Sequence, residues 1–199
     1  PHDEERPVYD KDGNIEKNED GTEKKRIVKP LPINDIHPLW LKAPKDCTDE
    51  DYKAFYQKVF MDFNEPLFWI HLNVDYPFNL KGILYFPKVN LEYENAEGVI
   101  KLYNNQVFIA DNIKEVIPEF LMLLKGVIDC PDLPLNVSRS ALQNDGFVNK
   151  IADYISKKVA DKLSGMCKTD RENYEKYWDD ISPFIKFGCL KDEKFCDKM

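Results

Sequence analysis

The spacing of apolar residues along the chain changes period twice. Between residues 52 and 60 the apolar side chains stand three or four positions apart, which is the period of a helix with one buried face. These side chains are Tyr52, Phe55, Tyr56, Val59 and Phe60. Just before them, Thr48 and Asp51 are spaced as an N-cap and its acidic partner in the first turn. The pattern therefore predicts an amphipathic helix that begins after Thr48.

After Pro66 the spacing becomes typical of short strands, with runs of β-branched and aromatic residues. The runs cover residues 67–74, 83–86, 99–103, 106–110 and 126–129. Asn104 and Asn105 stand between two of these runs, where a two-residue hairpin turn fits. Pro118 favours the first turn of a short helix through Leu124. The expected centre of the domain is a sheet.

The last third of the chain returns to the helical period. Apolar residues keep one stripe from residue 147 to 163, and Ser164 with Gly165 predicts the end of that helix. Two further features follow: Thr169 with Glu172 as a second capping box, and Pro183 as a break or bend in the next helix.

The first 30 residues differ from the rest because they are strongly charged and poor in apolar side chains. Such a segment buries too little surface to offset the entropy of ordering it. The Asp-Gly pairs at 12–13 and 20–21 predict turns, and residues 27–28 predict a short strand.

These patterns together predict an α+β fold in three segments. Residues 1–34 form a charged linker with room for a short strand. Residues 35–145 form a two-layer αβ sandwich. Residues 146–199 form a helical extension that leads into a further part of a longer protein.

Composition narrows the classes of partner and site. The net charge is −8, from 36 Asp and Glu against 28 Lys and Arg, whereas a nucleic-acid backbone favours a basic partner. Five scattered cysteines, without a CxxC pair or a Cys/His cluster, predict reduced thiols and no metal site. No apolar run is long enough to span a membrane. The common phosphate-loop, dinucleotide, hydrolase and zinc-protease motifs are absent.

One segment, DLPLNVSRSALQ at 132–143, combines unusual residues. Ser138 is spaced as a helix N-cap, so Arg139 falls in the first turn, where the helix dipole already presents positive charge. A cation there is favoured when an anion docks opposite, because free N–H groups and a guanidinium together bind phosphate. Gln143 lies four residues on, on the same helix face. The alternative is an ion pair between Arg139 and a nearby carboxylate such as Asp132.

The same segment resembles the catalytic loop in the middle domain of the heat-shock 90 chaperone family, in its bacterial HtpG form. Other blocks resemble that family in the same order, from about residue 35 to 190: TDEDYKAFYQKVF at 48–60, LYFPK at 84–88, IKLYNNQVFIADN at 100–112 and VIPEFLMLLKGVID at 116–129. The resemblance implies the αβ sandwich shared by GHKL transducer domains and the second domain of a small-subunit ribosomal protein. It also implies a role in ATP-dependent protein folding.

The resemblance further implies roles for individual residues. Arg139 matches the arginine that reaches the γ-phosphate of ATP, and Gln143 matches the glutamine beside it. Asn136 and Ser138 belong to the loop that supports them. Trp40 matches a partly exposed patch linked to contact with client or partner proteins, although a lone tryptophan is often a core anchor. ATP and Mg²⁺ are expected in the N-terminal domain of the full-length protein, with no cofactor in this chain.

The implied partners are the protein's own N-terminal ATP-binding domain and C-terminal dimerisation domain, unfolded client proteins and the 70-kDa heat-shock chaperone system. We expect a cytoplasmic location, no nucleic-acid or membrane partner, and no ATP hydrolysis by this chain alone. Two alternatives remain: a passive protein-interaction module without nucleotide contact, and the transducer domain of a DNA enzyme. The net charge counts against the second.

Overall fold

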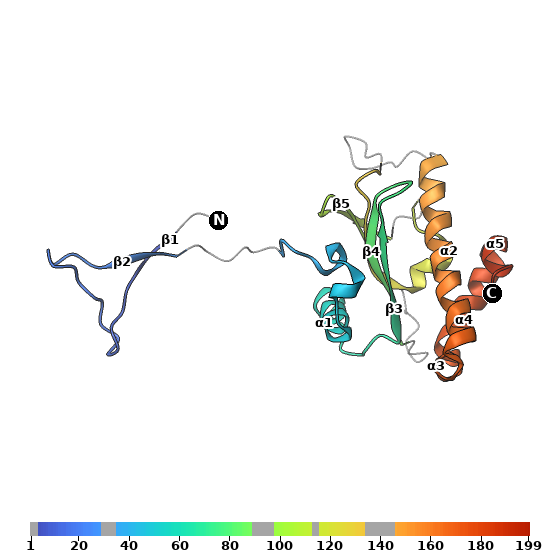
Figure 1. The fold of residues 1–199 in the computed structure, drawn as a ribbon, viewed down its shortest axis with the longest axis horizontal. Helices are drawn as coiled ribbons and strands as arrows, with labels where there is room; N and C mark the ends of the chain where they lie inside the picture. Colours follow the sequence, from blue (N-terminus) through green and yellow to red (C-terminus); the bar gives the residue numbers. More distant parts are fainter. Residues whose placement is uncertain (1–3, 29–34, 89–97, 113–115, 134–145) are drawn as a thin grey trace. The chain divides into compact units, whose positions relative to one another are not determined.

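The computed structural model describes residues 4–28, 35–88, 98–112, 116–133 and 146–199. These residues form two compact units, Pro1–Pro38 and Leu39–Met199. The boundary falls close to the end of the predicted charged linker. Figure 1 draws the helices and strands of each unit, coloured along the sequence.

The N-terminal unit contains a two-stranded antiparallel sheet, β1 (Glu4–Pro7) and β2 (Lys25–Val28). Isolated bridges continue the ladder toward two turns. Gly13 and Gly21 lie in these turns with φ of 85° and 82°, a backbone region that favours glycine. The predicted turns and the short strand at residues 27–28 are therefore confirmed. The side chains of β2 are mostly exposed, so this sheet has little core.

The second unit is built on a five-stranded sheet in the order β3-β4-β7-β5-β6. Its strands are β3 (Phe68–Val74), β4 (Leu80–Phe86), β5 (Ile100–Asn104), β6 (Val107–Asp111) and β7 (Lys125–Asp129). Neighbouring strands are antiparallel except β5 and β7, which are parallel. All five predicted strands are present, with ends shifted by three residues or fewer.

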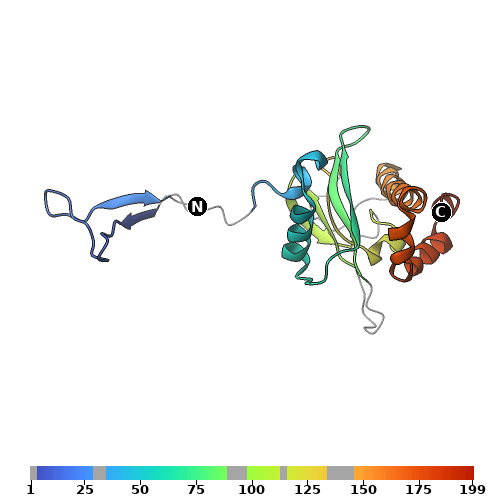
Figure 2. The same ribbon diagram turned by 60° about the horizontal axis from the view of Figure 1, so that its bottom comes forward.

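Helices cover both faces of this sheet. Helix α1 (Asp49–Phe60) lies on one side, and α2 (Gly146–Thr169) with α4 (Trp178–Lys191) lies on the other (Figures 1 and 2). The shorter helices are α3 (Arg171–Lys176), α5 (Glu193–Cys196) and the 3-10 turns Leu39–Leu41, Pro44–Asp46 and Glu119–Leu123. The predicted α+β sandwich with a helical extension is confirmed. The extension shares one hydrophobic core with the sheet.

Helix α1 begins where the sequence predicts. The Thr48 hydroxyl accepts a hydrogen bond from the Asp51 amide (3.2 Å), and the Asp51 carboxylate accepts one from the Thr48 amide (2.9 Å). This reciprocal capping box satisfies two amides that would otherwise lack partners. Tyr52 and Tyr56 are the buried residues of the helix.

Two predictions about the C-terminal helices are wrong, and of a third, a break or bend at Pro183, the break does not occur. Helix α2 does not end at Ser164 and Gly165 but continues to Thr169, because Leu163 and Met166 pack into the core on either side of the glycine. The Thr169 hydroxyl donates to the Gly165 carbonyl (2.9 Å) and does not cap the next helix, whose N-cap residue is Asp170. The residue predicted to break or bend α4, Pro183, stands inside that helix, which continues past it.

The β5–β6 turn lies one residue later than predicted. Its two central residues are Asn105 and Gln106, with φ of 50° and 65°, which is typical of a tight hairpin turn. Asn104 is consequently the last residue of β5 and not a turn residue. The short helix expected to begin at Pro118 is a 3-10 turn with Pro118 at its N-cap.

Candidate functional site

The segment predicted to bind phosphate lies outside the described residues. It contains the four residues expected to act on nucleotide or to support that loop: Asn136, Ser138, Arg139 and Gln143. The structure describes the chain on both sides of it, up to Leu133 and again from Gly146, the first residue of α2. The residues that directly precede this segment, 130–133, are described, and they are called the base of the site below.

The turn after β7 is fixed by backbone hydrogen bonds. The Cys130 amide donates to the Tyr103 carbonyl (3.1 Å), next to the parallel pairing of β5 and β7. The Leu133 amide donates to the Cys130 carbonyl (3.3 Å), and the Leu133 side chain is buried in the core on the α2 side. Burial raises the pKa of the Cys130 thiol to about 12. This cysteine is thus suited to packing and not to nucleophilic chemistry.

Asn104 adds side-chain contacts to the same turn. Its amide nitrogen lies 3.1 Å from the carbonyl oxygens of Cys130 and Pro131 and 3.5 Å from that of Leu133. Its own Oδ1 accepts a hydrogen bond from the Asn105 side chain (3.1 Å). The end of β5 is thereby joined to the carbonyls of three of the four residues of the turn, at positions 130, 131 and 133.

Asp132 holds the turn from another strand. Its Oδ2 accepts a hydrogen bond from the Asn79 amide (2.7 Å), one residue before β4 begins. Residues 130–133 are therefore held by the ends of two strands and by the burial of Leu133. The last described residues before position 134 are therefore firmly positioned.

Trp40 is buried, so the expectation of a partly exposed patch at this residue is wrong. Its side chain is 7% exposed, and its ring lies against Phe55 of α1 and Tyr103 of β5, with centroid distances of 5.8 and 5.1 Å. The indole N–H donates to Asp129 Oδ2 (3.2 Å). A hydrogen-bonded indole packed between helix and sheet is a core anchor.

Asp129 is also buried, beside a small cavity. Its Oδ2 accepts a second hydrogen bond from the Gln106 amide (2.9 Å), whereas Oδ1 has no hydrogen-bond partner among the described residues. The cavity has a volume of about 180 Å³ and is lined by Leu41, Asn79, Lys81, Asn105, Gln106, Asp129 and Pro131. Sites for drug-sized ligands usually have about 300 Å³ or more, so this cavity is too small for a nucleotide.

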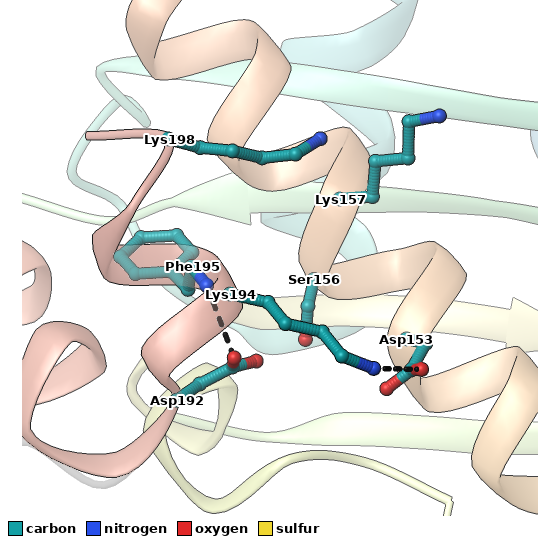
Figure 3. A pocket seen from close by; sticks show the side chains of 7 residues that line it. All are labelled: Asp153, Ser156, Lys157, Asp192, Lys194, Phe195 and Lys198. Atoms are coloured by element: carbon teal, nitrogen blue, oxygen red, sulfur yellow. Dashed lines mark hydrogen bonds and ion pairs between the residues drawn. The ribbon is translucent and has the colours of Figure 1, made fainter.

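A second cavity, of about 210 Å³, lies between α2 and the C-terminal residues. Figure 3 shows Lys194 of α5 reaching to Asp153 of α2, at 2.8 Å, and the Asp192 carboxylate accepting from the Phe195 amide, at 3.0 Å. Because aspartates line this cavity together with the lysines, it does not have the uniformly positive lining that would favour phosphate.

Within the ranges that the structure describes, no group of three or more His, Cys, Asp or Glu side chains is placed to hold a metal ion. In the same ranges, no helix is both long enough and apolar enough to cross a membrane.

Two residues at the base of the site were not predicted from sequence. Asp129 is a charged residue that directly follows the apolar pair Val127 and Ile128 at the end of β7, which in retrospect indicates a buried hydrogen-bonded group. Asn104 was assigned to a turn, and nothing in its sequence neighbourhood indicates contacts 26 to 29 residues away.

Comparison with known proteins connects this geometry to a family. Residues 2–199 match the family model described as Hsp90 protein. The chain belongs to the Hsp90 family. It is 54% identical over 166 residues to the chaperone protein HtpG of Porphyromonas gingivalis, and equally to that of Bacteroides thetaiotaomicron; each match covers 83% of this chain. HtpG of Oceanobacillus iheyensis is 37% identical over 169 residues.

This Hsp90-family chain spans about a quarter of the length of the relatives it matches: 24% of the Porphyromonas gingivalis protein and 27% of the Oceanobacillus iheyensis protein. The sequence-based recognition of an HtpG-type chaperone segment is confirmed. The relatives are chaperones by name, which agrees with the predicted heat-shock role.

Proposed function

We propose that this chain is the middle segment of an ATP-dependent Hsp90 chaperone and that it supplies Arg139 to the γ-phosphate of ATP. The observation that carries the proposal is the base at residues 130–133, which is held by Asn104 and Asp132. A guanidinium must be placed reproducibly to stabilise a transition state. A base that directly follows the central strand of the sheet, β7, meets that requirement better than a base within a long free loop.

Each loop residue has a specific part in this mechanism. Water attacks the γ-phosphorus as the bond to the leaving oxygen breaks, and Arg139 offsets the charge that develops on the phosphoryl oxygens. Gln143, on the same helix face, orients the water or the guanidinium. Asn136 and Ser138 hold the loop, Ser138 as the N-cap. The N-terminal domain binds ATP and Mg²⁺ and supplies the base.

The proposed partners are the N-terminal nucleotide domain, the C-terminal dimerisation domain, unfolded client proteins and the 70-kDa heat-shock chaperone system, in the cytoplasm. Because Trp40 is buried, it cannot offer its ring to a client in this conformation. Exposed apolar side chains on the second unit are better placed for such contact: Met61, Phe63, Tyr76, Phe108, Trp178 and Leu190.

The proposal is tested by Arg139→Ala in the full-length chaperone that carries this segment. Turnover should fall by about 10³-fold or more, the usual value of an arginine finger, while ATP affinity changes little. A slow domain closure would reduce the observed loss. Arg139→Lys should restore little activity, because an ammonium cannot reproduce the planar fork.

The matched control is Arg171→Ala, which removes an exposed arginine paired with Glu175 on α3 and should leave turnover unchanged. The isolated chain should fold and show no ATP hydrolysis above background. Normal turnover in Arg139→Ala would leave the passive interaction module as the better account.

A further inference from the structure

Two cysteines meet at the junction between α4 and α5. Helix α4 ends at Lys191 and α5 begins at Glu193, with Asp192 between them in an extended backbone conformation (φ −139°, ψ 105°). In one continuous helix, residues seven positions apart would be separated by about 10 Å along the axis. The break at Asp192 instead brings Cys189 and Cys196 together, and their thiols share a hydrogen bond.

The residues that precede the two cysteines pack directly against each other. Phe195 is 1% exposed, and its ring centroid lies 4.8 Å from that of Phe120. A Cβ atom at Gly188 would lie only 2.6 Å from Phe195 Cε1, so the glycine allows the ring to approach α4 closely. Figure 3 shows Asp192 accepting a hydrogen bond from the Phe195 amide at 3.0 Å, which fixes the start of α5. This packing holds the two cysteines side by side.

The two thiols differ in their access to solvent. Cys196 is exposed, whereas Cys189 is partly buried and packs against the main core. Burial, followed by the hydrogen bond with Cys196, raises the pKa of the Cys189 thiol. An exposed cysteine beside a second, sheltered cysteine is typical of a thiol that is oxidised first and then resolved by its neighbour.

We propose that Cys189 and Cys196 form a dithiol site that hydroperoxides oxidise to a disulfide. Cys196 is the attacking thiol because it is exposed, and Cys189 is the resolving thiol. The Cys196 thiolate attacks the terminal peroxide oxygen, so that an S–O bond forms and the O–O bond breaks. The leaving oxygen takes up the thiol proton and departs as an alcohol, or as water when the oxidant is hydrogen peroxide. Sulfur loses two electrons, and the peroxide gains them.

The second step closes the disulfide. The Cys189 sulfur attacks the sulfenic sulfur of Cys196, the S–S bond forms and the S–O bond breaks. The departing hydroxide takes the Cys189 proton and leaves as water. The net reaction converts two thiols and one hydroperoxide into one disulfide, one alcohol and one water. A dithiol reductant reverses the oxidation by thiol–disulfide exchange. This inference does not depend on the function proposed above for Arg139.

The test begins with the folded, reduced full-length chaperone that carries this segment. Hydrogen peroxide is added, remaining thiols are blocked, and the protein is digested with trypsin. Lys191 and Lys194 lie between the two cysteines, so the disulfide should join two separate peptides, residues 187–191 and 195–198. This linked pair should form roughly tenfold more than any pair that contains Cys167, because oxidation is selective for exposed thiols with a nearby partner. Dithiothreitol should separate the two peptides.

Two serine variants assign the roles of the thiols. Cys189→Ser should lose the linkage but retain a sulfenic acid at Cys196, which dimedone labels. Cys196→Ser should lose the linkage, and Cys189 should take up little dimedone. The matched control is Cys167→Ser, a partly buried thiol on α2, which should link peptides 187–191 and 195–198 as the unmodified protein does.

Three results would overturn the proposal. One is the absence of linked peptides after peroxide treatment of the folded protein. Another is linkage that appears only after the protein is unfolded in denaturant, since the geometry of the α4–α5 junction would then have no part in it. The third is equal dimedone labelling of Cys189 in Cys196→Ser and of Cys196 in Cys189→Ser, which would contradict the assigned order of attack.

Discussion

The two faces of the five-stranded sheet are packed by different chemistry, although the same strands supply both. Ile83 and Leu84 are neighbours in β4 and both fully buried, yet Ile83 faces α1 and Leu84 faces α2. On the α2 side the core is mainly aliphatic and phenylalanine side chains. On the α1 side it is built from hydroxyl-bearing rings, an indole and charged partners.

The polar contacts of the α1 side are short and specific. The Tyr56 hydroxyl donates to Asp62 Oδ2 (2.6 Å), and Lys125 Nζ lies 2.6 Å from the same oxygen. Burial alone would raise the pKa of Asp62, but the hydrogen bonds from Lys125 and Tyr56 hold it below its usual value. Apolar burial supplies most of the stability of such a domain, whereas directional contacts fix where strands and turns sit. The candidate site starts from the end of the sheet where Trp40 and Asp129 make such a contact.

The largest effect should come from the apolar face. Leu84→Ala should destabilise the chain by about 3 kcal/mol, since it leaves a cavity in a core with no exposed surface at that position. The loss of stability should be the same at pH 5.5 and 7.5, because packing between apolar side chains does not depend on protonation. Chemical denaturation at both pH values measures it, with Val107→Ala on the exposed edge strand as control. A loss below about 1 kcal/mol would contradict the assignment of this face as the main core.

An intermediate effect is expected on the polar face. Asp62→Asn should cost about 2 kcal/mol, because Lys125 stays 22% exposed and loses its charged partner. Glu65→Gln is the matched control: it breaks the Lys53–Glu65 pair, which has a similar distance of 2.8 Å but is exposed on both sides. That control should change stability by less than about 0.5 kcal/mol. Equal losses would show that burial does not distinguish the two ion pairs.

Some parts of the fold could be predicted from the sequence, and others could not. The capping box at Thr48 and Asp51 was predicted because its two hydrogen bonds are local. The end of α2 was not, because tertiary packing of Leu163 and Met166 outweighs a glycine that merely lacks helix propensity. Hydrogen bonds between residues close in sequence can be predicted from the sequence, whereas contacts between distant segments cannot.

The candidate site follows the same rule. The segment predicted to bind phosphate was singled out by its residue types and by its resemblance to the heat-shock 90 family; the family is confirmed, and the role of the segment stays a prediction. The contacts of Asn104 join residues that are 26 to 29 positions apart. The resemblance implied a partly exposed patch at Trp40, with a core anchor as the alternative. The structure confirms the core anchor, whose burial depends on α1 and on Asp129.

The smallest effect should be a pH dependence confined to the polar face. Burial lowers the pKa of His71, whose Nδ1 lies 2.7 Å from the Tyr52 hydroxyl of α1. As the pH falls, His71 therefore binds a proton in the unfolded chain before it does so in the folded chain. The contribution of neutral His71 to the free energy of unfolding is fully present above about pH 6.5 and is lost below it. The unfolding midpoint should fall between pH 7.5 and 5.5, and less so in His71→Gln. An identical slope in that variant would assign the effect to another group.

The most direct test of the central claim is a structure of the full-length chaperone with an ATP transition-state analogue. We predict that the Arg139 guanidinium lies about 2.7 to 2.9 Å from the oxygens of the terminal phosphate mimic, the usual length of such charged hydrogen bonds. Arg139 paired instead with a carboxylate of this chain, such as Asp132, with no contact to the phosphate mimic, would contradict the account.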